Sequence, residues 1–472
     1  MNRSREDLDA IDTRIPAVRF EQGSRLTSYA GLVIFQQLFV SLGLLARLRR
    51  CFDHLSRRTF EHARVVLLLV VHLLLGWRRL SGIACYREDP LVCRVVGFAT
   101  LPSGATVTRV LQDMDGPAVD KGRGLVRDLV LERLRREKLA RVTLDFDGSV
   151  QSTKALAEGT AVGFNKKKKG ARSYYPLYCT VAQLSSFLDL HHRPGNIHDS
   201  NGAREFMVAC IRRVRAGAPW KPIIESRMDS AFFGKDLLAA LLTEEVSFTC
   251  SVPLERLPEL ERIAKSTTSW RRINDRWSSA EVDYLPKSWR GDGRLTGKVR
   301  FVLYRQKVPR QRKQVVPGPR QLDLFRPDCT DYEYKAIVTN RIADDAAAVL
   351  FFHHGRGSQE KLFGEANQHA SLAVVATRGL HGNQMFTLAA MLAHNLSREL
   401  QMRAAPPQPR RRLTRTRPAL WRFLELGTIR QRLLHRAGRL VRPQGRDILA
   451  LAANEATKEA LGHYLGADRN AA

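Results

Sequence analysis

The stretch Arg141-Val142-Thr143-Leu144-Asp145-Phe146-Asp147-Gly148-Ser149 decides the fold of this chain. Its apolar residues alternate with polar ones and then give way to acids and a glycine turn, which predicts a buried β-strand ending at Asp147. Such a strand delivers the carboxylate of Asp147 to the edge of a sheet, where α/β proteins commonly bind their ligands. The stretch therefore predicts a sheet with a functional edge.

Two further acids follow comparable signals. The segment 221–228 contains a short apolar run that brings Asp229 to a Ser-Ala-Phe-Phe-Gly turn, so a second strand presents an acid at its end. Later, a Gly-Ser pair leads into a helical run whose first turn contains Glu360, close behind Arg356. Carboxylate oxygens are the ligands that Mg²⁺ prefers. Asp147, Asp229 and Glu360 are therefore candidate ligands of a pair of divalent cations. The alternative is that each acid caps a helix or pairs with a surface arginine.

The charge of the chain indicates a polyanionic partner. The 472 residues contain 77 Lys and Arg against 47 Asp and Glu, which gives a formal net charge of +30. Such an imbalance favours nucleic acid over a membrane surface. The scattered cysteines form no Cys-x-x-Cys pair and the polar N-terminus does not read as a signal peptide. We therefore expect a cytoplasmic protein that binds nucleic acid.

The periodicity of the sequence predicts a multidomain α/β protein. Residues 140–245 follow a strand-strand-strand-helix-strand order, which a mixed sheet of the ribonuclease H type gives and which other α/β sheets also allow. The expected domains are an all-α N-terminal DNA-binding domain over 1–135, the first part of the core over 136–245, a separate β-rich insertion over 246–345, the final helices of the core with Glu360 over 346–402, and a basic helical C-terminal tail over 403–472.

Several basic and hydroxyl side chains are candidate DNA contacts. Thr106 and Arg109 lie in a helix that follows a Pro-Ser capping signal, and a helix N-terminus binds phosphate well. An ordinary capped helix explains this pattern equally well. The run Lys166, Lys167, Lys168 and Lys169 lies between glycines and suits phosphate neutralisation, although such a run is also typical of a solvated loop. Arg227, next to the Asp229 turn, is a further candidate.

Taken together, short motifs along the chain resemble the DDE transposases of bacterial insertion sequences, in the branch with a β-rich insertion before the last acid. The resemblance runs from about residue 25 to 400, and the order and spacing of its pieces are more specific than any single piece. The matching pieces are Asp147-Gly148-Ser149, Tyr175-Pro176-Leu177, Arg193-Pro194-Gly195-Asn196, Arg227-Met228-Asp229-Ser230-Ala231-Phe232, Val338-Thr339-Asn340, Arg356-Gly357, Glu360 and Glu365.

The resemblance implies a ribonuclease H-like catalytic domain in which Asp147, Asp229 and Glu360 bind two Mg²⁺ ions, with Mn²⁺ as a substitute. It implies cut-and-paste transposition: the protein binds the terminal repeats of an element, cleaves the strands and joins them to target DNA. Arg356 would offer planar donors to a phosphate near the cut. A homodimer or larger synaptic complex is expected on the same ground.

The chain departs from the family signature Tyr-x-x-Arg-x-x-x-Glu-x6-Lys, because His353 stands at the Tyr position and Asn367 at the Lys position. Asp145 lies on the same strand face as Asp147, so either could bind metal, and the Asp-Gly-Ser match favours Asp147. Glu365 is an alternative to Glu360, which has the family's spacing from the arginine. Two other functions remain open: a metal-dependent nuclease without strand transfer, and a DNA-binding derivative that has lost catalysis.

Overall fold

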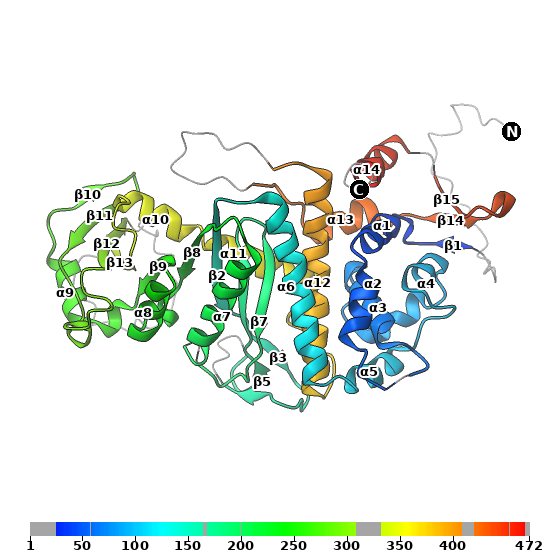
Figure 1. Ribbon diagram of the computed structural model, residues 1–472, viewed down its shortest axis with the longest axis horizontal. Coiled ribbons are helices and arrows are strands. Elements are labelled where there is room, and N and C mark those ends of the chain that lie inside the picture. The colour runs from blue at the N-terminus through cyan, green and yellow to red at the C-terminus, as the bar shows by residue number, and fades with distance from the viewer. Residues whose placement is uncertain are drawn as a thin grey trace, which may run out of the picture.

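A computed structural model describes residues 25–56, 58–163, 168–198, 200–307, 332–407, 420–452 and 454–467, and these fold around one large mixed sheet flanked by helices (Figure 1). The strands of this sheet, in chain order, are β2 (Arg141–Gly148), β6 (Leu177–Val181), β7 (Ser186–His191), β8 (Ile223–Met228), β9 (Ser247–Val252), β10 (Arg271–Arg272), β11 (Trp277–Val282), β12 (Arg300–Lys307) and β13 (Tyr332–Thr339). Their spatial order is β10-β11-β12-β13-β9-β8-β2-β6-β7. The expectation of a mixed α/β fold is confirmed.

The strand that ends in Asp147 lies inside this sheet, as the sequence predicts. β2 pairs with β6 in antiparallel and with β8 in parallel orientation, and β9 runs parallel to β8. The side chains of Val142, Leu144 and Phe146 are fully buried, and those of Thr143 and Asp145 between them are buried as well, so both faces of β2 are covered. β2 therefore fixes the position of its acids relative to both neighbouring strands.

The expected separate insertion is not a separate sheet. β13 pairs in antiparallel orientation with β9, with Ala336 opposite Val252, and β12, β11 and β10 add to it in turn. The expectation that these strands stand apart from the core is wrong, because the outer edge of β9 offers unpaired backbone groups that β13 satisfies. The sheet thus continues without a break from β2, β8 and β9 into the region 271–339.

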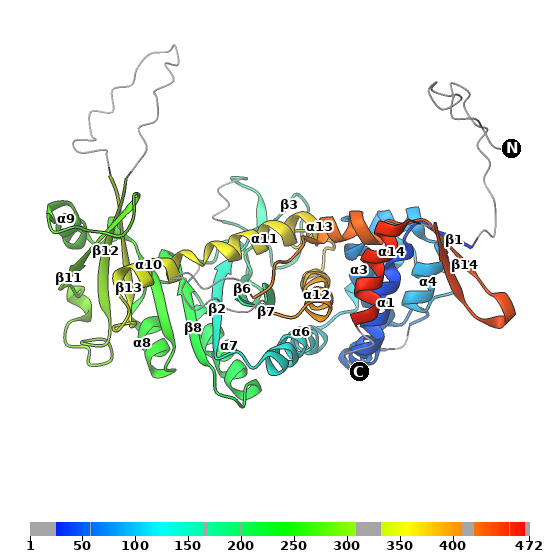
Figure 2. The same cartoon turned by 90° about the horizontal axis from the view of Figure 1, so that it is seen from above.

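Helices cover both faces of the sheet. α7 (Ala203–Gly217) and α8 (Lys235–Thr243) lie on one side, and α10 (Ala346–His354) and α11 (Gly357–His369) follow one another along the other side (Figure 2). A further helix of this part is α9 (Pro258–Ser266). α11 carries Glu360, so the last acid approaches the sheet from a helix.

The N-terminal unit consists mainly of short apolar helices packed on the long helix α12 (Leu380–Ala404). Its members are η2 (Ala30–Leu32), α1 (Val33–Ser41), α2 (Leu44–Cys51), α3 (His62–Leu74), η3 (Leu80–Tyr86), α4 (Pro90–Val96), α5 (Gly104–Gln112) and α6 (Gly116–Glu137). α1 and α2 are separate because Gly43 between them has φ +58°, a left-handed conformation that favours glycine. Within the described ranges no single helix is long and apolar enough to span a membrane, although the bent pair Ala30–Ser41 and Leu44–Cys51 passes by length and composition.

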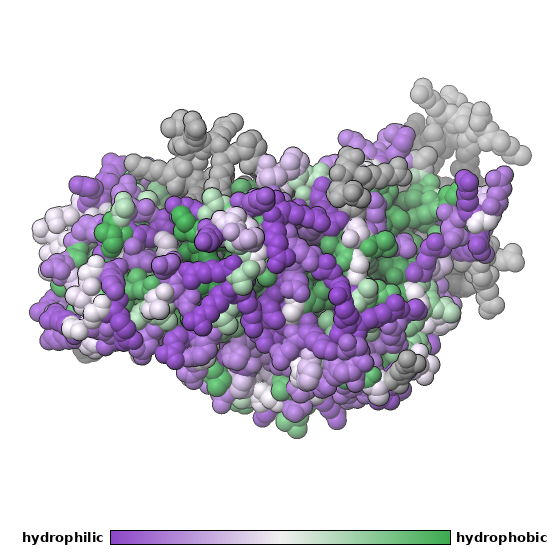
Figure 3. Space-filling view, in the orientation of Figure 1, coloured by the Kyte–Doolittle hydropathy of each residue, from purple (hydrophilic) through white to green (hydrophobic). Residues whose placement is uncertain are grey.

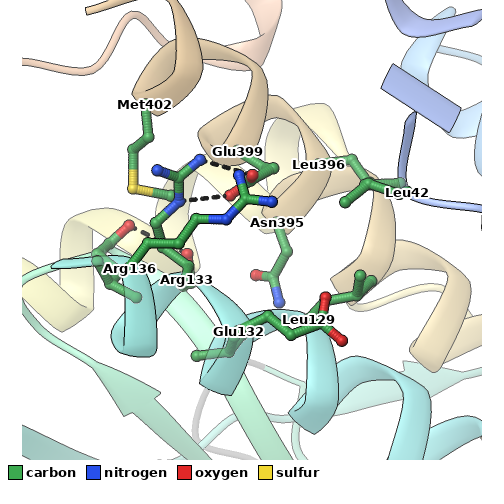
Figure 4. A pocket seen from close by; sticks show the side chains of 12 residues that line it. Leu42, Leu129, Glu132, Arg133, Arg136, Asn395, Leu396, Glu399 and Met402 are labelled. Carbon is green, nitrogen blue, oxygen red and sulfur yellow. Dashed lines mark hydrogen bonds and ion pairs between the residues drawn. The ribbon is translucent and has the colours of Figure 1, made fainter. Parts of the chain in front are cut away.

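A charged cluster joins α6 to α12 beside the edge strand β7. Arg133 donates from Nη2 to Glu399 Oε1 at 2.6 Å and from Nε to Glu399 Oε2 at 2.8 Å (Figure 4). It also pairs with Glu137. Arg133 and Glu399 are almost inaccessible, and a small cavity of about 30 Å³ lies next to them. This bidentate pair connects α6 of the N-terminal unit to α12, and these are the two longest helices that the structure describes.

The expected helical C-terminal tail is wrong in part, because its described portion also contains strands. β14 (Gly438–Val441) pairs with β15 (Ile448–Leu451) and with β1 (Leu26–Thr27), so this segment returns to the N-terminal unit. The remaining elements are β3 (Gln151–Thr153), β4 (Ala161–Val162) and β5 (Arg172–Tyr174), which form a small second sheet, the short helices η4 (Ser230–Phe232), η5 (Leu254–Arg256), η6 (Lys287–Trp289), η7 (Arg430–Leu434) and η8 (Pro443–Gly445), and the helices α13 (Leu426–Ile429) and α14 (Glu455–Ala467). The exact domain boundaries stay a prediction.

Candidate active site

Asp147 and Asp229 lie at corresponding positions of neighbouring parallel strands. Asp145 is the register partner of Arg227, and each candidate acid lies two residues further along its own chain segment. Asp147 is followed by Gly148, the last residue of β2, where an added Cβ would stand 2.5 Å from the ring of Tyr175. Asp229 accepts the backbone N–H of Ala231 at 3.0 Å and so begins η4. The sheet therefore brings both strand acids to one edge, as predicted.

Arg356 connects the strand acid to the helix acid. Its Nη1 donates to Asp147 Oδ2 at 3.2 Å and its Nη2 to Glu360 Oε1 at 3.4 Å. The side chains of Arg356 and Asp147 are 20% and 21% exposed, and that of Glu360 is 66% exposed. The structure thus groups Asp147, Arg356 and Glu360 at a site open to solvent. We call these three residues and Asp229 the outer layer of the site.

The outer layer fits a divalent cation in its donor chemistry but is not assembled around one. Carboxylate oxygens from Asp147, Asp229 and Glu360 are hard ligands of the kind that Mg²⁺ and Mn²⁺ accept. The guanidinium of Arg356 already supplies a positive charge between the carboxylates of Asp147 and Glu360. In the part of the chain that the structure describes, no group of three His, Cys, Asp or Glu side chains is arranged to hold a metal ion. Assembly would require the carboxylates to exchange Arg356 for a cation.

Beneath the outer layer, Asp145 and Arg227 form a buried bidentate ion pair. Arg227 donates from Nε to Asp145 Oδ1 at 2.8 Å and from Nη2 to Oδ2 at 2.5 Å. Asp145 is fully buried and Arg227 is 7% exposed. Burial raises the pKa of Asp145, and the charge and hydrogen bonds of Arg227 oppose that rise. The expected DNA contact by Arg227 is therefore wrong, and Asp145, the alternative metal ligand, is committed to this pair.

The same arginine supports the junction between α10 and α11. Its Nη1 donates to the carbonyl of Phe352 at 3.4 Å, and a Cβ on Gly355 would stand 1.9 Å from that nitrogen. Gly355 thus lets the backbone just before Arg356 pass close to Arg227. A glycine next to Arg356 therefore has a packing reason, since a side chain at this position would collide with Arg227.

Gln359 anchors α11 directly to β2, a role that the sequence analysis missed. It is 1% exposed, and its Nε2 donates to the Asp145 carbonyl at 3.0 Å and to Thr180 Oγ1 at 3.1 Å. Because Gln359 precedes Glu360, this anchor sets the height of the helix acid above the strand. The signal in the sequence is faint: a glutamine in the first turn of a helix ordinarily faces solvent.

His353 ties the end of α10 to β9. Its Nδ1 lies 3.0 Å from Thr249 Oγ1 and its Nε2 lies 2.8 Å from Ser251 Oγ, so both ring nitrogens are occupied. Burial is the main cause that lowers the pKa of His353 to about 3, and nearby Arg356 lowers it further. His353 is therefore neutral near pH 7. His353, an alternative site residue by sequence, instead supports the packing of α10 on β9, because it is 8% exposed and faces that strand. We call Asp145, Arg227, Gln359 and His353 the inner layer.

Glu365, the alternative helix acid, faces away from the outer layer. It is 9% exposed, forms an ion pair with Arg398 of α12, and accepts the backbone N–H of Leu426 at 2.9 Å. Because these contacts consume its carboxylate, the expectation that Glu365 could replace Glu360 as a metal ligand is wrong. Glu365 instead connects α11 to α12 and to the C-terminal segment.

The predicted DNA contacts outside the site are spread over the surface. Lys168 and Lys169 are exposed, and Lys166 and Lys167 lie outside the described residues. Arg109 is exposed on α5, whereas Thr106 takes part in the helix cap, with its backbone N–H 3.2 Å from Ser103 Oγ. The alternative interpretation of an ordinary capped helix thus accounts for Thr106. The contacts of these lysines and of Arg109 with DNA stay predictions.

A cavity of about 570 Å³ opens beside the outer layer, between β9, β13 and α10. Its lining includes Arg356 and Glu360 together with Lys335, Tyr334 and His354. Lys335 belongs to β13, which the sequence analysis assigned to a separate insertion. The continuation of the core sheet is what carries this lysine to the site.

Comparison with known proteins agrees with the geometry. No curated protein matches the sequence. A piggyBac transposase synaptic complex with hairpin DNA, solved by cryo-electron microscopy, is 12% identical, covers 78% of this chain and 75% of that chain, and has a TM-score of 0.41. A pre-cleavage Mos1 transpososome is 12% identical over 35% of this chain and 56% of that chain, with a TM-score of 0.18. TM-scores of this size do not establish a shared fold. The family model of the transposase DDE domain, group 1, matches residues 13–469, and the chain therefore belongs to the DDE transposases.

Proposed function

We propose that this transposase binds the ends of a mobile DNA element, cleaves the DNA strands there and joins them to a target. The observation that carries the proposal is the outer layer: Arg356 contacts both Asp147 and Glu360, which come from a strand and from a helix far apart in the sequence. Asp229 begins η4 at the end of the neighbouring parallel strand. Carboxylates brought together in this way suit a phosphoryl-transfer site that uses divalent cations.

We further propose that the core is of the ribonuclease H type. The order β7-β6-β2-β8-β9 supports this assignment, because β6 and β7 are antiparallel to their neighbours while β2, β8 and β9 run parallel. The acids stand on β2 and directly after β8, at the centre of that order. A bacterial insertion-sequence origin and a cytoplasmic location stay predictions.

DDE transposases generally use divalent metals, and we propose Mg²⁺, with Mn²⁺ as a substitute, held by Asp147, Asp229 and Glu360. Divalent cations at such a site activate an attacking water or 3′-hydroxyl and stabilise the leaving oxygen. The residues of the chain have complementary tasks. Arg356 offers planar N–H donors to a phosphate, and the inner layer holds both Arg356 and Glu360 at the sheet edge.

The proposed partner is DNA, as terminal repeats and as target. The net charge of +30 attracts a polyanion, and hydrophilic side chains predominate on the face in Figure 3. Exposed Lys168, Lys169 and Arg109 are proposed phosphate contacts. Two DNA ends must meet for strand transfer, so we propose a homodimer or larger synaptic complex.

The test is excision of a DNA segment bounded by the element's own ends, with Mg²⁺ or Mn²⁺, by the wild type and by Asp229→Asn. The matched control is Asp236→Asn, which makes the same chemical change at an exposed position on α8. We expect excision by the wild type and the control, and at least about a hundredfold less by Asp229→Asn, since a lost metal ligand removes several kcal/mol of transition-state stabilisation.

The junction sequences distinguish the remaining functions. Joined target sequences identify strand transfer, whereas cut ends without joining identify a nuclease. If no protein cuts and all of them bind the ends equally, the chain is a DNA-binding derivative and the catalytic proposal fails.

A further inference from the structure

We propose that Arg356 holds Asp147 and Glu360 in the DNA-free protein and that a DNA phosphate draws it away, which makes the carboxylates more available to a divalent cation when DNA is present. This inference rests on the proposed function, because it concerns the same carboxylates. It adds a regulation of the site: the metal and the DNA would bind cooperatively through one guanidinium.

The first argument is geometric. The two ion pairs use different nitrogens of one guanidinium, Nη1 toward Asp147 at 3.2 Å and Nη2 toward Glu360 at 3.4 Å. Two carboxylates directed at one cationic group already form the surroundings of a cation. As long as the guanidinium stays between them, a metal ion faces a like charge within a few ångströms.

The second argument concerns strength. The N–O distances are long for charge-assisted hydrogen bonds, and neither pair has two parallel N–H donors on one carboxylate. The side chain of Arg356 is one-fifth exposed and that of Glu360 is two-thirds exposed, so solvent screens the attraction. By contrast, the buried arginine beneath, Arg227, is bidentate to Asp145. Arg356 is therefore the arginine of the site that can change partners.

The third argument is the chemistry of the competitor. A phosphodiester presents anionic oxygens that a planar guanidinium binds with two parallel donors, which is a better match than its present single contacts. The cavity of about 570 Å³ that Arg356 lines gives DNA access to it. Because binding linkage is reciprocal, a phosphate that removes Arg356 raises the affinity for metal, and metal raises the affinity for DNA by the same factor.

The test measures Mn²⁺ binding by electron paramagnetic resonance, with and without a short DNA duplex, after subtraction of the Mn²⁺ held by the duplex alone. The measured quantity is the fraction of protein that holds Mn²⁺, which does not depend on enzymatic activity. The variants are Arg356→Gln, which removes the bridge and its charge, and Arg356→Lys, which keeps the charge but cannot reach both carboxylates with a planar fork. Circular dichroism verifies that each variant is folded.

Lys335→Ala is the matched control for charge. Lys335 lines the same cavity, but its Nζ lies 3.6 Å from Glu333 Oε1 and over the Trp277 ring, away from the outer layer. Its removal takes one positive charge from the cavity and leaves the bridge intact.

Without DNA, we expect Arg356→Gln to bind Mn²⁺ about tenfold more tightly than the wild type, which corresponds to about 1.4 kcal/mol. Arg356→Lys should gain part of this affinity and Lys335→Ala less than about twofold. The duplex should raise the affinity of the wild type and change that of Arg356→Gln little. Equal affinities of the wild type and both Arg356 variants, or a gain in Lys335→Ala as large as in Arg356→Gln, would overturn the inference alone. Absence of saturable Mn²⁺ binding in every protein, with and without DNA, would overturn the proposed metal site as well.

Discussion

Asp145 and Asp147 stand two residues apart on one strand, and each contacts an arginine, yet the two pairs differ in almost every physical respect. The inner pair, Asp145 with Arg227, is buried and bidentate, and its partners come from adjacent strands. The outer pair, Asp147 with Arg356, has one long contact and is open to solvent. Because burial decreases toward the end of β2, this strand places a buried support and a more exposed site residue two positions apart. Residue type alone does not distinguish them.

The largest expected effect comes from breaking the inner pair. Arg227→Ala leaves the Asp145 carboxylate buried without its counter-charge, and removal of one partner of such a pair costs about 3–5 kcal/mol. The free energy of unfolding in urea measures this loss. Arg356→Ala is the matched change in the outer layer, and we expect it to cost less than about 1 kcal/mol. Similar losses for the two variants would contradict the distinction between the layers.

A second, smaller effect concerns pH. Burial lowers the pKa of His353 to about 3, below its ordinary 6.5, so the unfolded chain binds the extra proton between these values. Stability from this group is therefore complete above about pH 6.5 and decreases as the pH falls toward 3. Between pH 7 and pH 5 the loss is about 2 kcal/mol for this one histidine.

His353→Gln measures that contribution, because a glutamine can reach the hydroxyls of Thr249 and Ser251 without titrating. We expect its free energy of unfolding to fall less between pH 7 and pH 5 than that of the wild type, by about 2 kcal/mol. Buried His394, whose pKa is also lowered to about 3 by burial, supplies the comparison through His394→Gln. An unchanged pH dependence in His353→Gln would show that this ring is protonated in the folded protein.

The smallest expected change in stability tests how the inner layer positions the outer one. Gln359→Met keeps the length of the side chain but loses both donated hydrogen bonds, at a cost of about 1 kcal/mol. Excision should decrease about tenfold, since Glu360 loses its fixed height over β2. Gln368→Met, at an exposed position on the same helix, is the control. A loss of stability without any loss of excision would limit Gln359 to packing.

The sequence allowed the outer layer to be predicted better than the inner one. Asp147 and Asp229 could be located because a strand period and a turn are local signals, and the parallel pairing of β2 with β8 then follows from the order of elements. Arg227 was assigned to DNA because an arginine beside a candidate acid is usually solvated. Its burial depends on Asp145, 82 residues earlier, and no local pattern records such a distance. Gln359 and the hydroxyl partners of His353 were missed for the same reason.

The expectation for residues 246–345 failed on a related ground. β12 and β13 agree with the expected β-rich region, whereas β10 and β11 lie in segments for which no strand was predicted. Whether strands form their own sheet or extend an existing one depends on which edge is open. That edge belongs to β9, and only the folded chain shows that it is accessible to β13.

The contact between Glu365 and Leu426 has a consequence for the order in which the protein is made. The carboxylate that steadies α11 accepts the N–H of a residue that follows it by 61 positions, and Arg398 and Gln401 of α12 also bind the Leu424 carbonyl. A ribosome that has translated only as far as α12 has produced every acid of the outer layer, but these polar groups still lack their final partners. The nascent chain therefore completes the support of α11 among the last steps of synthesis. A chain that ends after residue 407 would contain every acid of the outer layer but would lack the contacts of Leu424 and Leu426 that hold α11 and α12. We therefore expect α11 to be less stably positioned in such a truncated chain.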